Sequence, residues 1–180
     1  MIDSFKHKGL RNLFEQDDAR KVKADQVDRL RLILSTLDQA SDVRDMNQPT
    51  FRLHLLKGNR KGVWAVTVTT TWIWKITIRK DDAMPMKNPV HPGALAKANL
   101  DELNLSVAEA AKAMKITRQQ LHNVMQGRSA VTPEMALRFE KAFGGKADLW
   151  LRMQGAYDLR KARKNQRKMN IPRLVEHPSR

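Results

Sequence analysis

The sequence predicts an α+β domain followed by an all-α domain, and three observations support this prediction. Apolar residues recur at helical spacing over about 22–38, and they alternate with other residues at strand spacing over 51–78. Three prolines and a glycine at 81–93 exclude a regular helix or a central strand there. Beyond that stretch every apolar pattern has the period of a helix. We therefore expect an N-terminal domain at 1–80, a linker at 81–93, a C-terminal domain at 94–163 and a basic tail at 164–180.

The N-terminal domain is predicted to be a small antiparallel sheet with two helices packed on one face. An opening strand at 2–6 and a short helix at about 8–16 precede the amphipathic helix at about 22–38. Three strands follow, and glycines at 58 and 62 mark the turn between the first two. The residues expected to share a face within each strand are Phe51, Leu53 and Leu55, then Trp64, Val66 and Val68, then Trp72, Trp74, Ile76 and Ile78.

The other face of this sheet combines one histidine with several cations. Alternation along the first strand places His54 opposite the apolar residues. An imidazole among cations could hold RNA phosphates and move a proton at a ribose hydroxyl. The candidate catalytic residues are therefore His54, Lys57, Arg60, Lys75 and Arg79. A solvated face with one surface histidine accounts for the same pattern, and alternation alone favours that simpler interpretation.

Helix start signals divide the C-terminal domain. Ser106-Val107-Ala108-Glu109 and Thr117-Arg118-Gln119-Gln120 are capping boxes, and Thr132-Pro133 combines a cap with proline at the first helical position. Gly127 and Gly144-Gly145 are stop signals. Helices are thus predicted at 106–114, at 117–126, from 132 to the glycine pair, and beyond it. In the helix from 132, Met135, Leu137, Phe139 and Phe143 are expected to face inward. The last helix carries Trp150, Leu151, Met153, Tyr157 and Leu159.

The helices at 106–114 and 117–126 have the proportions of a helix-turn-helix, with Ile116 at the corner. The polar side of the second helix has the residue types that hydrogen-bond base edges in a major groove. Basic and hydroxyl residues flank its ends, where phosphate contacts would fall. The candidate DNA-binding residues are Lys115, Thr117, Arg118, Gln119, Gln120, His122, Asn123, Arg128 and Ser129. A helical hairpin whose polar face meets only water is the alternative, and the caps, spacing and charge together favour DNA.

Composition points to the same class of partner. The 180 residues include 34 Lys+Arg and 19 Asp+Glu, a net charge of +15, which is typical of proteins that bind a polyanion. The absence of cysteine excludes disulfides and thiol nucleophiles, and we expect neither a cofactor nor a metal. No apolar run approaches the ~18 residues of a membrane span, and the first residues lack the apolar stretch that a signal peptide needs. We expect a cytoplasmic protein, associated with the nucleoid and not with membranes.

Ordered motifs in the second half carry a resemblance to a known family. They include Asn88-Pro89-Val90-His91-Pro92-Gly93, Arg118-Gln119-Gln120-Leu121, Thr132-Pro133-Glu134-Met135-Ala136-Leu137-Arg138 and Trp150-Leu151-Arg152-Met153-Gln154. With these motifs, about 84–163 resembles a HigA-type antitoxin, an Xre-like helix-turn-helix repressor with a lambda-repressor-like fold. The resemblance implies a dimeric operator-binding protein that neutralises a toxin and represses its own promoter.

The first half carries a second resemblance. Met1-Ile2-Asp3-Ser4-Phe5-Lys6-His7-Lys8-Gly9-Leu10 and Arg52-Leu53-His54-Leu55-Leu56-Lys57-Gly58 are similar to HigB toxins of the RelE/ParE superfamily, over about 1–80. The resemblance implies a RelE-like fold and ribosome-dependent cleavage of mRNA. The chain departs from the family at Lys75, where an arginine is typical, and it lacks the closing strand with its tyrosine–histidine pair. We therefore expect a degenerate toxin domain without nuclease activity.

The predicted function is sequence-specific DNA binding and transcriptional repression by an antitoxin fused to a toxin-like domain. Double-stranded operator DNA of its own promoter and a second copy of the chain are the expected partners. One alternative is a self-inhibited, ribosome-dependent mRNA endoribonuclease, with the ribosome and mRNA as partners. Another is a protein-binding module in which the degenerate toxin-like domain acts as a decoy and captures a free antitoxin from another locus. A cognate toxin or antitoxin is a further possible partner.

Overall fold

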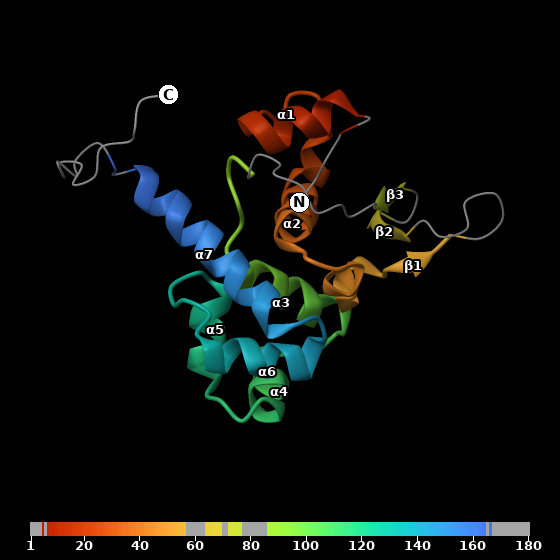
Figure 1. Ribbon diagram of the computed structural model, residues 1–180. Helices are drawn as coiled ribbons and strands as arrows, with labels where there is room; N and C mark the ends of the chain where they lie inside the picture. The colour runs from red at the N-terminus through yellow and green to blue at the C-terminus, as the bar shows by residue number, and fades with distance from the viewer. Residues whose placement is uncertain are drawn as a thin grey trace.

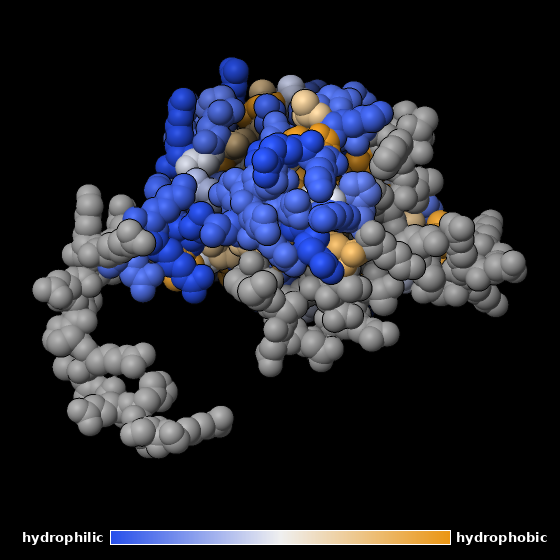
Figure 2. Space-filling view, turned by 90° about the horizontal axis from the view of Figure 1, so that it is seen from above, coloured by the Kyte–Doolittle hydropathy of each residue, from blue (hydrophilic) through white to orange (hydrophobic). Residues whose placement is uncertain are grey.

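A computed structural model of the chain describes residues 5, 7–56, 64–69, 72–76, 86–164 and 166, and of 69 and 72–76 only the backbone. The chain forms two connected parts: an N-terminal part with helices and a small sheet, and a C-terminal bundle of helices (Figure 1). The predicted α+β half followed by a helical half is confirmed. Hydrophilic side chains dominate the face seen in Figure 2, interrupted by small apolar areas.

Two helices of the N-terminal half form close to where the sequence predicts them. Helix α1 spans Lys8–Gln16, and the imidazole of His7 caps it by accepting the Leu10 N–H at 3.3 Å. Helix α2 spans Val27–Gln39 and is preceded by the 3₁₀ turn η1 (Ala24–Gln26), so it begins later than expected. Two more 3₁₀ turns follow, η2 (Val43–Met46) and η3 (Pro49–Phe51). The strand predicted at 2–6 lies, apart from Phe5, outside the described residues.

Within the described residues the sheet has three antiparallel strands in the order β1-β2-β3. They are β1 (His54–Leu55), β2 (Trp64–Thr69) and β3 (Trp72–Ile76), and Trp64 lies opposite Ile76. The turn predicted around glycines 58 and 62 lies outside the described residues, as does Ile78.

The first predicted strand is mostly wrong. Phe51 ends η3, which begins at Pro49, and Arg52 adopts the left-handed conformation (φ 46°), so the chain bends where an extended strand was expected. The bend buries Phe51 completely and leaves Leu55 47% exposed instead of facing the helices. Alternation failed here because a proline and a left-handed residue interrupt it.

The described residues of the C-terminal half form five helices, and three of them begin at the start signals read from the sequence, at Ser106, Thr117 and Thr132. They are α3 (Pro92–Glu102), α4 (Val107–Ala113), α5 (Arg118–Met125), α6 (Pro133–Phe143) and α7 (Ala147–Lys164). One inward prediction is wrong, because Leu137 is 53% exposed, and Leu159 of the last helix is exposed to the same extent. Helix α6 buries Ala136, Phe139 and Phe143 along the opposite side, and the end of α7 extends beyond the bundle (Figure 1). No helix in the described ranges has the length and apolar character to cross a bilayer.

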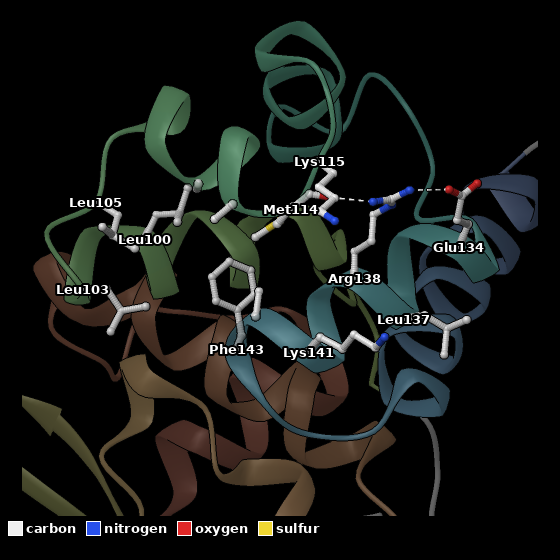
Figure 3. A pocket seen from close by; sticks show the side chains of 13 residues that line it. Leu100, Leu103, Leu105, Met114, Lys115, Glu134, Leu137, Arg138, Lys141 and Phe143 are labelled. Atoms are coloured by element: carbon white, nitrogen blue, oxygen red, sulfur yellow. Dashed lines mark hydrogen bonds and ion pairs between the residues drawn. The ribbon is translucent and has the colours of Figure 1, made fainter.

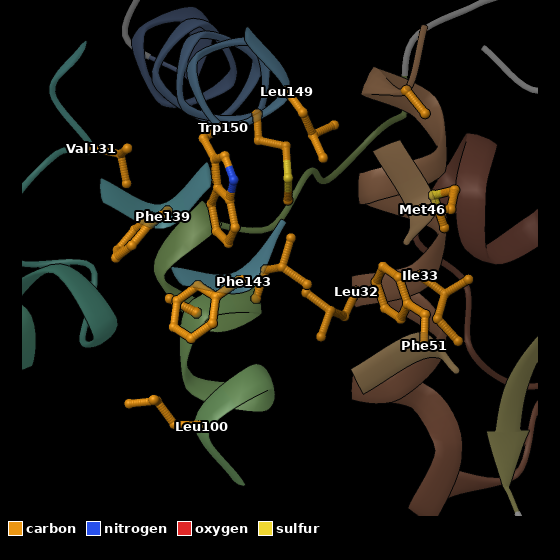
Figure 4. Packing of buried hydrophobic residues seen from close by; sticks show 14 of the residues in the cluster. Leu32, Ile33, Met46, Phe51, Leu100, Val131, Phe139, Phe143, Leu149 and Trp150 are labelled. Atoms are coloured by element: carbon orange, nitrogen blue, oxygen red, sulfur yellow. The ribbon is translucent and has the colours of Figure 1, made fainter. Parts of the chain in front are cut away.

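The two halves share one hydrophobic core. Trp150 of α7 is fully buried between Phe139 and Phe143, with its ring centroid 4.7 Å from that of Phe139. The same cluster continues through Leu149 to Leu32 and to the side chains around Met46 (Figure 4). Each half therefore contributes apolar surface that the other removes from water.

Polar contacts cross the same boundary. Arg152 of α7 donates to the carbonyl of Gln39 at 2.7 Å and pairs with the buried carboxylate of Asp45 at 3.0 Å. The amide of Asn99 in α3 accepts from the Thr50 N–H and donates to Gln48. These bonds satisfy groups that would otherwise be buried without partners at the boundary.

The first described residues of the predicted linker, 86–91, lie along the N-terminal half. Its backbone N–H groups donate to the Asp38 carboxylate, the Phe14 carbonyl and the Ser35 hydroxyl, each at about 3 Å. Helix α3 then begins at Pro92, within the stretch predicted as linker. Residues 86–91 are thus attached along their length to α1 and α2.

Candidate nucleic-acid interface

Helix α4 is fixed at its start by the predicted capping box. The Ser106 hydroxyl accepts the Glu109 N–H at 3.2 Å, and the Glu109 carboxylate accepts the Ser106 N–H at 2.9 Å. The Ser106 hydroxyl also donates to the Glu109 carboxylate at 2.6 Å, and this bond, followed by the one from the Ser106 N–H, lowers the pKa of Glu109 because both favour the charged carboxylate. Ala110 and Ala111 are buried against the rest of the bundle, so α4 can approach its neighbours closely.

The turn between α4 and α5 is tight. Lys115 adopts a left-handed conformation (φ 54°), and the Ile116 N–H closes the turn on the Ala111 carbonyl at 3.0 Å. The Lys115 side chain is exposed at this corner. Arg138 of α6 donates to the carbonyl of Met114, which ties the turn to the next helix.

Helix α5 starts with a second complete capping box. The Thr117 hydroxyl accepts the Gln120 N–H at 3.1 Å, and the Gln120 amide oxygen accepts the Thr117 N–H at 2.9 Å. Leu121 and Val124 are buried, and they fix which side of α5 faces the protein. Arg118, Gln119 and Gln120 are exposed on the other side, while His122 and Asn123 are half-buried.

Two amides on the exposed side of α5 are paired one turn apart. The Gln119 amide nitrogen donates to the Asn123 amide oxygen at 2.8 Å. The Asn123 amide NH₂ and the Gln119 oxygen keep their capacity for outside partners. Gln120 differs from them, because its oxygen is already engaged by the cap.

The end of α5 turns sharply at Gly127, whose φ of 67° is the left-handed conformation that favours glycine. The N–H groups of Arg128 and Ser129 both donate to the Asn123 carbonyl, at 2.9 and 3.3 Å. The Arg128 and Ser129 side chains are exposed immediately beyond the helix. The predicted candidates therefore lie together on α5 and at its two ends, with Lys115 at one end and Arg128 at the other.

Two residues for which the sequence predicted no role, Gly93 and His91, hold α5 in place. Gly93, in the first turn of α3, lies so close to the Val124 carbonyl that a Cβ there would overlap it. His91 caps α3 by accepting the Gly93 N–H at 3.0 Å, lies next to Gly127, and packs edge-on against Tyr157 of α7, with ring centroids 4.9 Å apart. Both belong to the quoted motif at 88–93, which was the only signal in the sequence for this role.

His91 makes the stability of this arrangement sensitive to pH. Burial lowers the pKa of His91 below its ordinary value of 6.5, because the charged imidazolium loses hydration, and Lys161 adds to the decrease while Asp158 opposes it. The folded chain then binds fewer protons than the unfolded chain between the lowered pKa and 6.5. The contribution of His91 to stability is complete above pH 6.5 and is lost as the pH falls through the lowered pKa.

We expect the free energy of unfolding, measured by urea denaturation, to fall between about pH 7.5 and about pH 5.5. The variant His91→Asn keeps an oxygen that can accept the Gly93 N–H but does not titrate, so part of this decrease should disappear. An unchanged pH dependence in His91→Asn would show that other groups cause it.

Residues 3–85 match a family described as the RelE-like toxin HigB of type II toxin–antitoxin systems, and residues 95–150 match a helix-turn-helix family. Endoribonuclease HigB of Proteus vulgaris is 44% identical over 72 residues, which are 40% of this chain and 78% of that protein. The chain thus belongs to the HigB-like toxins through its first half.

The second half has relatives of its own. The uncharacterised helix-turn-helix-type transcriptional regulator YddM of Escherichia coli K12 is 37% identical over 92 residues, 51% of this chain and 98% of that protein. Among solved structures, Pseudomonas aeruginosa antitoxin HigA with the higBA promoter is 26% identical, over 49% of this chain and all of that one, with a TM-score of 0.45. The chain therefore joins a HigB-like half to a helix-turn-helix half, as the two resemblances predict.

In the HigB-like half the structure describes little of the predicted catalytic set. His54 is half-buried in β1, and its Nδ1 lies 2.9 Å from the Arg52 carbonyl oxygen. The backbone of Lys75 is in β3, opposite Ala65, which in turn pairs with His54. Lys57, Arg60 and Arg79 lie outside the described residues. The grouping of these five side chains thus remains a prediction.

Proposed function

We propose that the chain is a sequence-specific DNA-binding repressor of a type II toxin–antitoxin system, acting on the operator of its own promoter in the bacterial cytoplasm. The main support is the polar side of α5. A capping box fixes the start of this helix, and Arg118 and Gln119 are exposed on its polar side. The match to a helix-turn-helix family and the relative named as a transcriptional regulator agree with it. The net charge of +15 supplies the long-range attraction to DNA.

In this proposal α5 lies in the major groove, and its side chains have different roles. Arg118 pairs with a guanine through its planar fork of N–H donors, and the linked amides of Gln119 and Asn123 meet an adenine. His122 is next to them on the half-buried edge. Gln120 and Thr117 contribute mainly by holding the start of the helix, since each is engaged in the capping box.

The ends of α5 provide the contacts to phosphate. Lys115 precedes the helix and Arg128 and Ser129 follow it, all with exposed side chains. Such contacts set the register on the duplex and contribute affinity that does not depend on sequence. Their share of the binding energy should weaken with rising salt.

The proposal is tested by two arginine variants, titrated against the DNA upstream of the chain's own gene and against a scrambled duplex. Arg118→Ala should weaken binding to the promoter by about 1–3 kcal/mol and leave binding to scrambled DNA nearly unchanged. Arg128→Ala should weaken both duplexes alike and reduce the salt dependence by about one ion. Equal losses on both duplexes in Arg118→Ala would contradict base reading by this residue.

A second candidate function is a self-inhibited mRNA endoribonuclease. The sequence similarity of the HigB-like half to a protein named as an endoribonuclease favours this function. Ribosome-dependent cleavage of mRNA by the intact chain, absent from His54→Ala, would support this function. We propose instead that the HigB-like half is inactive, because Lys75 replaces a bidentate arginine and the closing tyrosine–histidine pair is missing.

A further inference from the structure

The face of α7 that packs on the bundle changes character near the end of the helix. Its buried and half-buried residues recur at intervals of three and four: Trp150, Met153, Gln154 and Tyr157. The same spacing continues to Lys161 and Lys164, whose side chains are exposed. These two lysines, here called the α7 basic stripe, lie on the part of α7 that extends beyond the bundle (Figure 1).

This face of α7 lies beside the loop that follows α5. The Gln154 amide oxygen accepts the Val131 N–H of the loop at 2.9 Å. One turn further along α7, Tyr157 packs edge-on against His91, which lies next to the end of α5. Burial is the main cause of the lowered pKa of His91, and the nearby charge of Lys161 adds to it. The α7 basic stripe therefore begins next to the loop after α5.

The loop and the stripe together can follow one strand of DNA. The loop contains two of the residues proposed to contact phosphate, Arg128 and Ser129. Because an α-helix rises about 1.5 Å per residue, Lys161 lies ~10 Å and Lys164 ~15 Å along α7 from the bond between Gln154 and the loop. Cations at these positions can bind phosphates of the strand that the loop holds, without any contact to a base.

The protein does not neutralise the two lysines of the stripe. Neither forms an ion pair with any of the described residues. Asp158, three residues before Lys161, instead accepts the Gln154 amide at 2.9 Å. Arg138 of α6 is the opposite case, because Glu134 and a backbone carbonyl engage its guanidinium (Figure 3). Both lysines thus keep their charge for an outside anion.

The dipole of α7 does not account for this arrangement. Cations near the C-terminal end of any helix are favourable, whichever face they occupy. Arg163 meets that preference from the far side of the helix, two residues after Lys161. Lys161 and Lys164 instead share the face next to the loop after α5. A polyanion bound along that face explains their position.

We propose that the α7 basic stripe is a second DNA-binding element, in which Lys161 and Lys164 bind backbone phosphates next to those held by the loop after α5. The proposal rests on the proposed function, because it requires α5 on duplex DNA. The stripe gives the chain additional affinity that does not depend on base sequence. The bound region therefore extends beyond the base pairs that α5 reads.

The double variant Lys161→Gln/Lys164→Gln of the full chain tests this element, in titrations of the promoter duplex and a scrambled duplex at several salt concentrations. Each lost phosphate contact lowers the slope of log K against log salt by about 0.9, so we expect a decrease of about 1.8. At about 0.1 M salt both duplexes should bind about tenfold more weakly or worse, with an unchanged preference for the promoter. Lys161→Arg/Lys164→Arg keeps both charges and should retain the slope.

The matched control is Lys146→Gln/Arg163→Gln. It removes the same two charges from exposed positions, one before the start of α7 and one on the far side of its end, and should leave the slope unchanged. An equal decrease in the control would reveal an effect of net charge alone and would overturn the proposal. An unchanged slope in Lys161→Gln/Lys164→Gln would also overturn it. So would a lower molecular mass of this variant without DNA, because the stripe would then join two copies of the chain.

The outcome is separable from that of the proposed function. Equal binding of both duplexes by the unmodified chain would refute base reading by α5, while the slopes would still measure the stripe. A preference for the promoter, combined with an unchanged slope in Lys161→Gln/Lys164→Gln, would refute the stripe alone. Binding of neither duplex would overturn both proposals.

Discussion

Replacing Gly93 by alanine should destabilise the chain by about 3 kcal/mol, toward the upper end of the cost of overpacking. The added methyl would overlap the Val124 carbonyl, which is backbone and cannot rotate away. Relief requires α3 and α5 to move apart. Urea unfolding should show the loss of stability, and promoter binding by the folded protein should also weaken, because α5 shifts relative to the rest of the bundle.

Gly155→Ala is the matched control for this change. Gly155 lies in α7, and an added Cβ meets nothing within 4 Å. Alanine has the higher helix propensity, so Gly155→Ala should stabilise the chain by about 0.5–1 kcal/mol. If Gly93→Ala were as well tolerated as Gly155→Ala, the close contact between α3 and α5 would be contradicted.

The change Arg152→Met should cost about 2–3 kcal/mol. It retains the apolar stem of the side chain but leaves the Asp45 carboxylate, which is fully buried, without its cation. Arg152 is itself 36% exposed, so the loss should be smaller than for a fully buried pair. Because the bond joins the HigB-like half to α7, both halves should become less stable in a single unfolding transition.

Arg44→Met provides the comparison. Arg44 pairs with Asp42 at 2.6 Å, but its side chain is 73% exposed, so its loss should cost far less stability than the loss of Arg152. Adding Asp45→Asn to Arg152→Met removes the unpaired charge and should recover part of the stability. Two separate transitions, with only one of them affected by Arg152→Met, would contradict a shared core.

The sequence predicts best what short-range chemistry decides. The capping boxes at Ser106 and Thr117 fix the helix starts through bonds three residues apart, so they could be read without knowing the fold. The exposed side of α5 follows from the same local periodicity. The engagement of Gln120 in the cap is also local, although the sequence alone left it among the base-reading residues.

Features that depend on distant parts of the chain could not be read in this way. Leu137 is apolar and at helical spacing, yet it is exposed because α7 packs against the opposite side of α6. Phe51 fits the alternation of a strand in the sequence, but the bend at Arg52 buries it at the end of a 3₁₀ turn. Gly93 and His91 make tertiary contacts with α5 and its end, between segments about 30 residues apart. The periodicity of the sequence cannot predict such contacts.

The central claim is that the exposed side of α5 reads bases in duplex DNA. Recovery of genomic DNA fragments with the intact chain, followed by sequencing, tests it most directly. We predict one recurrent sequence that includes the promoter of the chain's own gene, with half-sites about 34 Å apart, and its loss in Arg118→Ala. Recovery of fragments in proportion to their abundance, or the same recurrent sequence with Arg118→Ala, would contradict the account.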